Sequence, residues 1–380
     1  MHIAYITPEY PHELTRASGG MGTSIKNLVH AIVNTGHQVT LFIYGQEISQ
    51  VFEENGIVFH LIKKQSYPFL GFYRHRKFIQ NYINTHAVAV DILEAPDWTG
   101  ITAFMYLKKP LVIRFHGSDT YFCHLEKRTQ KFKNKWFEKL GVQKATAFIA
   151  PTTYAGEKSM ELFHLPKERL SIIPYGIALE NFENDQPETF ETYRVLNIGT
   201  LIRKKGVFQL IEMFNRLIEI EPKSTLIFIG ADSGDIQTGS NSTWELMQNQ
   251  MTEKAASRIT YLGKIPYELV QEQIKRAHVC VFPSFAETLG MVTIESMALQ
   301  KAVVNTSIGW AKDIIDHGVD GFMHHPDDVD AYVETIKELF DNKQLVRSIG
   351  KAGRMKTAEK FDIYKTVHQN IEFYKRICSL

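Results

Sequence analysis

Short apolar segments rich in β-branched residues alternate with segments of helical periodicity along the whole chain. This alternation predicts parallel sheets built from β-α units, rather than an all-helical or an all-β fold. The predicted strands are HIAYIT, QVTLFIY, GIVFHLI, VDILEA, PLVIRFH, AFIAPT and SIIPYG in the first half, and YRVLNIG, TLIFIG, RITYLG, VCVFPS, AVVNT and GFMHH in the second. Each half is expected to form a doubly wound α/β unit, whose ligands bind where strands end and loops begin.

An acidic segment without sustained periodicity, IALENFENDQPETFET, separates the two sets of strands and contains a proline. It is typical of an interdomain linker. We predict a first domain over residues 1–178, a linker over 179–192 and a second domain over 193–361. Apolar residues recur at near-helical spacing in the remaining stretch, 362–380, which predicts an amphipathic helix.

Length and composition agree with two soluble domains. A chain of 380 residues is long enough for each half to bury its own core, and no apolar run approaches the roughly 20 residues of a membrane span. The three cysteines show no metal-ligand spacing, and the first residues lack the layout of a secretion signal, so we expect a cytoplasmic protein. The net charge of +1 divides into +6 up to Ala178 and −5 beyond it. This division indicates halves with different partners, or an uneven scatter of surface charge.

The segment PSFAETLGMVTIESMA carries the most specific chemistry. A helix that starts near Met291 would present free backbone N–H groups to a phosphate. Glu287 and Glu295 flank this helix start, and carboxylates accept hydrogen bonds from vicinal diols, so one could hold a sugar and the other a ribose. The alternative is that Glu287 caps the helix and that Glu295 faces solvent.

The segment VLNIGTLIRKKGVFQLIEMF repeats the order of strand, glycine-bearing loop and helix. Arg203, Lys204 and Lys205 fall just before Gly206 and the helix start. Cations in this place could hold a diphosphate and stabilise the charge that develops on it as it leaves. A solvated basic turn is the alternative.

A glycine-rich loop follows the first strand, where Gly19, Gly20 and Gly22 precede a helix predicted from about Thr23. Glycines permit a ligand to approach the backbone closely. The loop is not G-x-G-x-x-G in register, and no acidic residue ends the second strand, which disfavours a dinucleotide-dependent oxidoreductase.

The apolar strand in PLVIRFHGSD ends in three polar candidates, Arg114, His116 and Asp119. They stand at the topological position where active-site residues collect. His116, followed by Gly117, would project toward a ligand. A structural role is the alternative for a single histidine.

Taken together and in this order, these segments resemble the retaining glycosyltransferases of the GT-B fold, the large family four or glycosyl transferases group 1. That family includes sucrose synthases and bacterial mannosyl- and glucosyltransferases. The likeness spans nearly the whole chain through GGMG, HG, IIPYGI, GTLIRKKG, YLGKI, PSFAETLGMVTIESMA and GWAKDII. It implies two Rossmann-like domains that face each other across a cleft, with the helix of residues 362–380 crossing back to pack on the first domain.

The resemblance also implies roles for individual residues. They are His116 and Glu287 for catalysis; Gly20, Thr200, Arg203, Lys205, Gly290 and Met291 for the donor diphosphate; Glu287, Thr288, Leu289 and Gly290 for the donor sugar; and Lys264, Ile265 and Glu295 for the nucleoside. The family's mechanism is front-face, with the leaving phosphate accepting the acceptor's proton, and needs neither metal nor cofactor. Thr200 stands where the family commonly has arginine, for which Arg203 or Lys204 can compensate, and Trp310 stands where a glycine is common.

The implied activity is transfer of a hexose from a nucleoside diphosphate sugar, most favourably UDP-linked, to a hydroxyl of a glycan or glycolipid. We expect it in the synthesis of cell-surface polysaccharide or glycoconjugate. A phosphorylase or hydrolysing epimerase of the same fold and a non-catalytic sugar-nucleotide-binding protein remain as alternatives. The near-zero net charge and the lack of a binding module disfavour nucleic acid.

The basic segment 124–140 interleaves aromatic residues with lysines and is expected to form a helix. Such a helix can lie on anionic headgroups at the inner face of the membrane, which would suit a lipid-linked acceptor, or it can pack within the domain. The segment YRHRK, residues 73–77, is interpreted as a solvated helix start.

Overall fold

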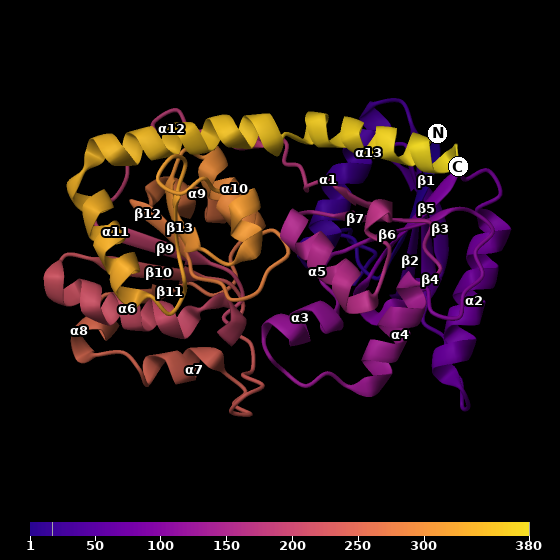
Figure 1. Cartoon of the computed structure of the whole chain (residues 1–380), viewed down its shortest axis with the longest axis horizontal. Helices are drawn as coiled ribbons and strands as arrows, with labels where there is room; N and C mark the ends of the chain where they lie inside the picture. Colours follow the sequence, from indigo (N-terminus) through magenta and orange to yellow (C-terminus); the bar gives the residue numbers. More distant parts are fainter. Residues whose placement is uncertain (17, 380) are drawn as a thin grey trace. The chain divides into compact units, whose positions relative to one another are not determined.

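The computed structural model describes residues 1–16 and 18–379, and the chain forms two compact units. Unit 1 comprises Met1–Ala178 together with Phe361–Leu380, and unit 2 comprises Leu179–Lys360. Both are α/β structures with sheets of mainly parallel strands covered by helices (Figure 1). Each predicted strand overlaps an observed one. Alternation of apolar segments and helical periodicity was therefore sufficient to define the fold class.

Unit 1 is built on an eight-stranded sheet in the order β3-β4-β2-β1-β5-β6-β7-β8. Its strands are β1 (His2–Thr7), β2 (Gln38–Gln46), β3 (Gln50–Glu54), β4 (Ile57–Lys63), β5 (Ile92–Pro96), β6 (Leu111–Arg114), β7 (Ala147–Ala150) and β8 (Leu170–Ile172). Its helices are α1 (Gly20–Asn34), α2 (Gly71–His86), α3 (Asp119–Leu125), α4 (Phe132–Val142), α5 (Thr153–Phe163) and α13 (Ile363–Cys378). The chain reverses its direction of winding between β1 and β5, which places a ligand-binding position at the carboxyl ends of these strands.

Both faces of this sheet are buried, because successive side chains of a strand point to opposite faces. Ile3 and Tyr5 of β1 lie in one core with residues of α1 and α13, whereas Ala4 and Ile6 lie in a second core with residues of α2. Strands buried on two faces need nearly continuous apolar sequence, as HIAYIT provides.

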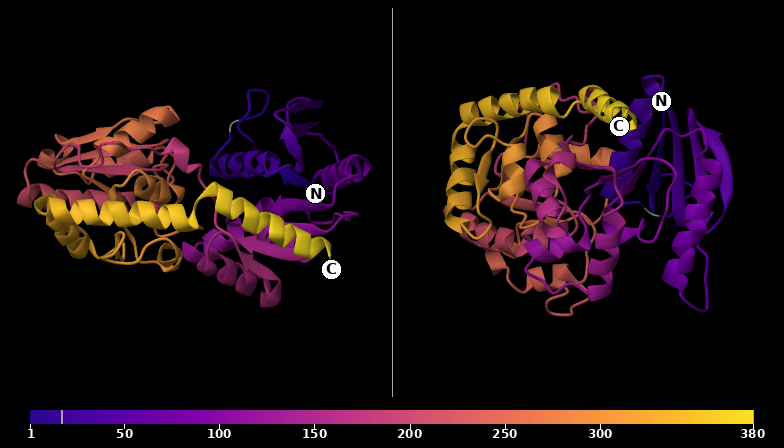
Figure 2. Two further views of the ribbon diagram at one scale, coloured as in Figure 1. Left: turned by 90° about the horizontal axis from the view of Figure 1, so that it is seen from above. Right: turned by 45° about the vertical axis from the view of Figure 1, so that its right-hand side comes forward.

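The helix α13 belongs to unit 1 although it follows the whole of unit 2 in the sequence. Val367, Ile371 and Tyr374 share a core with β1, and α13 lies beside α1 (Figures 1 and 2). The Tyr374 hydroxyl donates to Glu94 Oε2 of β5 at 2.5 Å. Both apolar burial and a buried polar contact therefore attach this helix to the sheet.

The side chain of Arg114, at the end of β6, lies inside unit 1. Its guanidinium donates to both Glu94 oxygens, at 2.7 and 3.0 Å, and to Asn370 Oδ1 of α13 at 2.5 Å. Both side chains of the ion pair are at most 3% exposed. The interpretation of Arg114 as an active-site candidate was therefore wrong, because this side chain connects the sheet to α13.

One strand of unit 1 was missed by the sequence analysis. β3 pairs antiparallel with β4 at the sheet edge, and Asn55 and Gly56 form the two-residue turn between them with positive φ angles of 52° and 74°. An Asn-Gly pair in this conformation is a strong signal for a β-hairpin. The strand QVFEE is mostly exposed, so it lacks the apolar run that identified the other strands.

Unit 2 contains a six-stranded parallel sheet in the order β11-β10-β9-β12-β13-β14. Its strands are β9 (Arg194–Ile198), β10 (Thr225–Ile229), β11 (Ile259–Tyr261), β12 (Val279–Phe282), β13 (Ala302–Thr306) and β14 (Phe322–His324). Its helices are α6 (Val207–Ile220), α7 (Thr243–Gln248), α8 (Glu253–Ala256), α9 (Tyr267–Arg276), α10 (Met291–Ala298), α11 (Val329–Asp341) and α12 (Lys343–Lys360). This is the Rossmann strand order, so the topological switch point lies between β9 and β12.

Two interpretations of basic segments need correction. The segment 124–140 is not one helix, since α3 ends at Leu125 and α4 begins at Phe132. Arg76, which is predicted to lie in a solvated helix start, is instead buried and donates to the carbonyl oxygens of Thr99 and Gly100 at 3.1 and 3.2 Å. Within the described residues, no helix combines the length and the apolar character that a membrane span requires.

Candidate functional site

Two loops meet at the switch point of unit 2, one after β9 and one after β12. Gly206 has φ of 68°, and any side chain there would collide with the carbonyl oxygen of Pro283. The backbone N–H of Phe285 donates to the carbonyl oxygen of Lys204 at 2.7 Å. Glycine at position 206 is thus required both by the positive φ and by the close approach of the second loop.

Lys205 and Glu287 form an ion pair where these two loops meet. Lys205 comes from the loop after β9 and Glu287 from the loop after β12, and their side chains form an ion pair. They are 23% and 18% exposed, so both groups remain accessible at the surface of unit 2. The structure therefore joins the residues that were predicted to bind diphosphate and sugar.

Arg203 has a different partner. Its guanidinium forms two hydrogen bonds with the Asp235 carboxylate, at 2.9 and 2.8 Å, and lies over the ring of Phe208 at 4.4 Å. These hydrogen bonds from Arg203, with others from Thr238, lower the pKa of Asp235 to about 2. Arg203 is thus held against the segment after β10, while the predicted diphosphate residue Thr200 is exposed.

Glu295 lies on α10 and is half-buried. Burial raises the pKa of its carboxyl group to about 7, although the Tyr267 hydroxyl, which donates to Glu295 Oε1 at 2.9 Å, acts in the opposite direction. Tyr267 is the first residue of α9 and follows the exposed Lys264 and half-buried Ile265 closely in sequence. Sequence reasoning missed Tyr267, whose position two residues after the YLGKI motif was the available signal.

The helix α10 begins at Met291, as the sequence predicted. Gly290 precedes it with φ of 92°, a conformation that favours glycine. The side chains of Thr288 and Leu289 are buried, so these two residues can contribute to a ligand site mainly through their backbone. Backbone N–H groups at a helix start favour a negatively charged ligand.

In unit 1, His116 follows β6 and makes two specific contacts. Its Nδ1 lies 2.7 Å from the Tyr175 hydroxyl, and the two rings stack with centroids 5.5 Å apart. Its backbone N–H donates to Asp97 Oδ1 at 2.9 Å. Burial, with the charge of Arg114, lowers the pKa of His116 to about 3, so the imidazole is neutral near pH 7.

Asp97 and Tyr175 were not among the predicted residues. Asp97 follows β5, at the unit's switch point, and burial raises the pKa of its carboxyl group to about 7. An acidic residue directly after an apolar strand was the signal in the sequence. Tyr175 lies far along the chain from His116, so spacing could not have paired them.

The glycine loop of unit 1 leads into α1, which begins at Gly20. A Cβ on Gly20 would meet nothing within 4 Å, so this residue borders open space. The backbone N–H of Gly22 donates to Glu9 Oε1 at 2.8 Å, which places a carboxylate at the start of the helix. Asp119, the remaining strand-end candidate, accepts from Asn134 and Arg128 at 3.1 and 3.3 Å.

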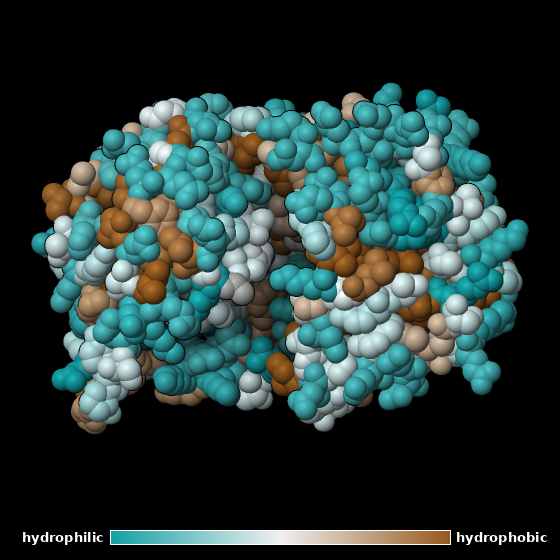
Figure 3. All heavy atoms as spheres, turned by 180° about the vertical axis from the view of Figure 1, so that it is seen from behind, coloured by the Kyte–Doolittle hydropathy of each residue, from teal (hydrophilic) through white to brown (hydrophobic). Residues whose placement is uncertain are grey.

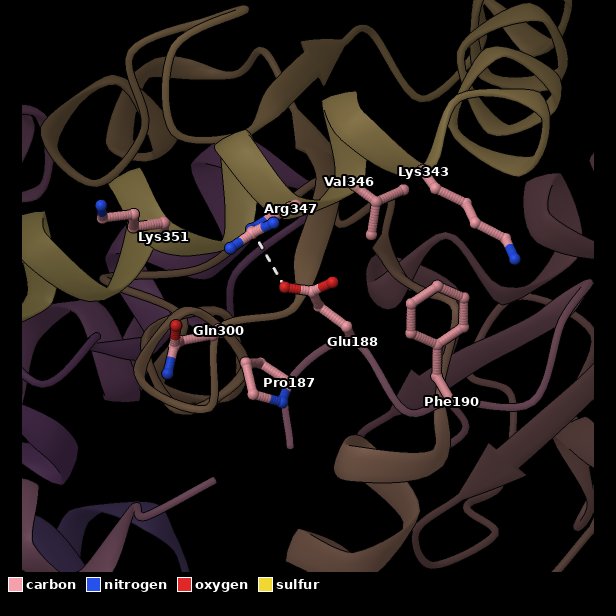
Figure 4. Close-up of a pocket in the computed structure, with 8 residues that line it drawn as sticks. All are labelled: Pro187, Glu188, Phe190, Gln300, Lys343, Val346, Arg347 and Lys351. Carbon is pink, nitrogen blue, oxygen red and sulfur yellow. Dashed lines mark ion pairs between the residues drawn. The ribbon is translucent and has the colours of Figure 1, made fainter. Parts of the chain in front are cut away.

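Unit 2 also has a surface hollow of about 400 Å³ that none of the predicted donor residues lines (Figure 4). Its lining residues are Pro187, Glu188, Phe190, Gln300, Lys343, Val346, Arg347 and Lys351. Two of these residues, through the Arg347 guanidinium and the Glu188 carboxylate, form an ion pair at 3.0 Å (Figure 4). Across the part of the chain that the structure describes, no cluster of three or more acidic, histidine or cysteine side chains is arranged for a metal ion.

The two α/β units share the fold of solved glycosyltransferases of the GT-B class. Residues 18–181 match the family described as Glycosyltransferase Family 4, and residues 180–356 match Glycosyl transferases group 1. The chain belongs to this family of glycosyltransferases.

Individual relatives resemble the chain over its full length. An uncharacterised glycosyltransferase of Methanocaldococcus jannaschii is 22% identical over 99% of this chain and 98% of its own. The structure of sucrose-phosphate synthase from Thermosynechococcus elongatus matches with a TM-score of 0.78 at 19% identity, covering 100% of this chain and 99% of that one. HepE of Anabaena, in a complex with UDP-glucose, matches with a TM-score of 0.75 at 18% identity, covering 100% of both chains. At this level of identity, these two structures show that the chain shares their fold.

Proposed function

We propose that the protein is a retaining hexosyltransferase that uses a nucleoside diphosphate sugar, with UDP-linked donors favoured. The observation that carries this proposal is the Lys205–Glu287 pair at the switch point of unit 2, in which Glu287 lies four residues before the start of α10 at Met291. It places a cation, a carboxylate and backbone N–H donors in two neighbouring loops. That HepE, which shares the fold, was solved with UDP-glucose supports a UDP-linked donor.

Each group suits one part of such a donor. Lys205 and the backbone at Gly290 and Met291 bind the diphosphate, and they stabilise the negative charge that grows on it as the bond to the sugar breaks. Glu287 accepts hydrogen bonds from the sugar hydroxyls, and Glu295, held by Tyr267, accepts them from the ribose. Arg203 orders the segment after β10 through Asp235.

The proposed transfer proceeds on one face of the sugar. The acceptor oxygen forms a bond to the anomeric carbon while the bond from that carbon to the phosphate oxygen breaks, and the leaving phosphate takes the acceptor's proton. No cofactor or metal is required. His116 is neutral near pH 7, so its imidazole is suited to donate a hydrogen bond rather than a proton. When its Nδ1 accepts from Tyr175, its Nε2 carries the hydrogen that it can donate.

A donor panel tests this proposal. The protein is incubated with UDP, GDP and ADP sugars, and nucleotide release is measured together with the shift in thermal denaturation. We expect at least one nucleotide to stabilise the protein and its sugar form to release nucleotide when an acceptor glycan is present. Absence of both responses throughout the panel contradicts the proposal. Turnover that depends on inorganic phosphate indicates a phosphorylase, and donor binding without turnover on any acceptor indicates a binding protein.

The Tyr267–Glu295 contact predicts a pH dependence of nucleotide binding. Glu295 has a pKa of about 7, so affinity should fall as the pH decreases through 7 and the carboxylate takes up a proton. The Tyr267 hydrogen bond lowers that pKa, so Tyr267→Phe should raise it and move the loss of affinity to higher pH. We expect the variant to bind nucleotide about fivefold more weakly at pH 7.5, as for one lost hydrogen bond.

Isothermal titration calorimetry between pH 5.5 and 8.5 measures this effect. Tyr106→Phe removes a hydroxyl from an exposed tyrosine of unit 1 and serves as the matched control. If the Tyr267→Phe profile superimposes on that of the unmodified protein, Tyr267 does not position Glu295.

A further inference from the structure

Unit 1 exposes a group of large apolar side chains around the starts of α2 and α4. This aromatic-basic surface consists of Phe69, Leu70, Tyr73, Phe132 and Trp136. Phe132 and Phe69 are 82% and 71% exposed. Single exposed apolar residues are ordinary, whereas a contiguous group of this kind marks an interaction site.

Ring contacts connect the two helices into one surface. The ring of Phe104 lies between them, 5.8 Å from that of Tyr73 on α2 and 5.4 Å from that of Trp136 on α4. Beneath it, Phe72 of α2 and Phe137 of α4 are 5.1 Å apart. The first residues of α2 and α4 lie at the same lower edge of unit 1 (Figure 1), and hydrophobic residues are visible at the tip that leads into α2 (Figure 3).

The exposed charged side chains of α2 and α4 are basic. The sequence of α2 contains no Asp or Glu. The acidic residue of α4, Glu138, is buried, where it accepts from the backbone N–H groups of Asp119 and Thr120, at 2.9 Å each. The cations of the two helices and the residue before α4 are Arg74, Arg76, Lys77, Lys131, Lys133, Lys135 and Lys139, of which Arg76 is buried.

The lysines also lie close to the rings. The Lys133 ammonium is 5.6 Å from the ring centroids of both Phe72 and Phe137, and that of Lys77 is 5.7 Å from Tyr73. Aromatic side chains surrounded by lysines match the interface of an anionic bilayer, where rings enter the headgroup region and ammonium groups meet phosphates.

We propose that unit 1 binds the surface of an anionic lipid bilayer through this aromatic-basic surface. Phe69, Phe132 and Trp136 enter the headgroup region, and Lys131, Lys133 and Lys135 lie at the lipid phosphates. Lipid binding is a property of unit 1 alone. The consequence that it brings the enzyme to a lipid-linked acceptor rests on the proposed function.

Flotation of the full-length protein with vesicles tests this binding. Vesicles of phosphatidylcholine alone are compared with vesicles of one part phosphatidylglycerol and two parts phosphatidylcholine. We expect binding to the anionic vesicles, weakened by high salt because surface charges are then screened. If the protein does not float with anionic vesicles at low salt, the proposal is wrong.

Two triple variants and a control separate the contributions of rings and charges. Replacement of all three lysines, Lys131, Lys133 and Lys135, by glutamine should lower the constant for partition onto anionic vesicles on the order of a hundredfold. Replacement of the three aromatic residues, Phe69, Phe132 and Trp136, by serine should lower this partition constant at least about tenfold. The control, Lys343, Arg347 and Lys351→Gln, removes the same charge from α12 (Figure 4) and should bind like the unmodified protein. Equal loss in the control means that net charge, not this surface, governs binding.

Tryptophan fluorescence reports whether the rings enter the lipid. We expect a blue shift on addition of anionic vesicles that Trp136→Phe abolishes while flotation is retained. Loss of flotation in the lysine variant but not in the ring variant indicates a surface that recognises acidic partners by charge alone, and contradicts insertion. Thermal denaturation and nucleotide release with a water-soluble acceptor show that each variant is folded and active, so a failure of lipid binding is distinguishable from a failure of the proposed function.

Discussion

Replacement of Glu287 by alanine is expected to reduce kcat/KM by about two to three orders of magnitude, because it removes contacts that position the donor sugar in the transition state. The side chain is partly exposed and lies in a loop, so the fold should not depend on it. Its ion pair with Lys205 is also near the surface, where such pairs contribute little to stability. Kinetics and thermal denaturation of the same preparations separate these two effects.

Lys205→Ala should give a loss of similar size, since the diphosphate then lacks its principal cation in unit 2. Lys254→Ala provides the matched control, because Lys254 also pairs with a glutamate of unit 2, Glu219 at 2.8 Å, but lies on α8 away from the strand-end loops. The control should retain full activity. If Glu287→Ala and Lys205→Ala both turn over at the unmodified rate, the proposed donor site is wrong.

The second large effect concerns stability. Glu94→Ala is expected to lower the free energy of unfolding of unit 1 by about 3–5 kcal/mol, because it leaves the guanidinium of Arg114 buried and without its carboxylate partner. The same change removes the acceptor of the Tyr374 hydroxyl, so α13 should become less firmly attached to the sheet. Urea denaturation, monitored by hydrogen exchange in peptides from β5, β6 and α13, measures the decrease in the free energy of unfolding of unit 1.

Replacing both partners tests the electrostatic explanation. Glu94→Gln combined with Arg114→Met removes both charges, and it should cost less than the sum of the single replacements because no unpaired charge is left in the core. Additive losses would show that the two side chains stabilise unit 1 independently. If Glu94→Ala lowers the free energy of unfolding by less than about 1 kcal/mol, the Glu94–Arg114 pair contributes no more than a surface ion pair does, and the electrostatic explanation is wrong.

The sequence predicted most of the architecture because parallel strands buried on two faces require continuous apolar segments. HIAYIT and AVVNT coincide with β1 and β13. The missed strand, β3, lies at a sheet edge and carries Glu53 and Glu54, so hydrophobicity did not reveal it. Its turn residues, Asn55 and Gly56, would have done so.

The candidate site was predictable where chemistry is local in sequence and not where it depends on tertiary contacts. Lys205 and Glu287 each stand in a motif at a strand end, and the structure pairs them. Tyr267 acts on Glu295 from another helix, and no spacing rule connects them. Arg114 was misread for the same reason, because its partner Asn370 follows 256 residues later on α13.

The central claim is that Glu287 holds the donor's sugar and Glu295 its ribose. Calorimetric titration of Glu287→Gln and Glu295→Gln, with UDP and with the UDP-sugar that the panel identifies, tests it most directly. We predict that Glu287→Gln binds UDP normally but loses the additional affinity for the UDP-sugar, whereas Glu295→Gln binds both ligands more weakly by the same factor. Equal weakening of both ligands by Glu287→Gln, or unchanged UDP binding by Glu295→Gln, would contradict the assignment.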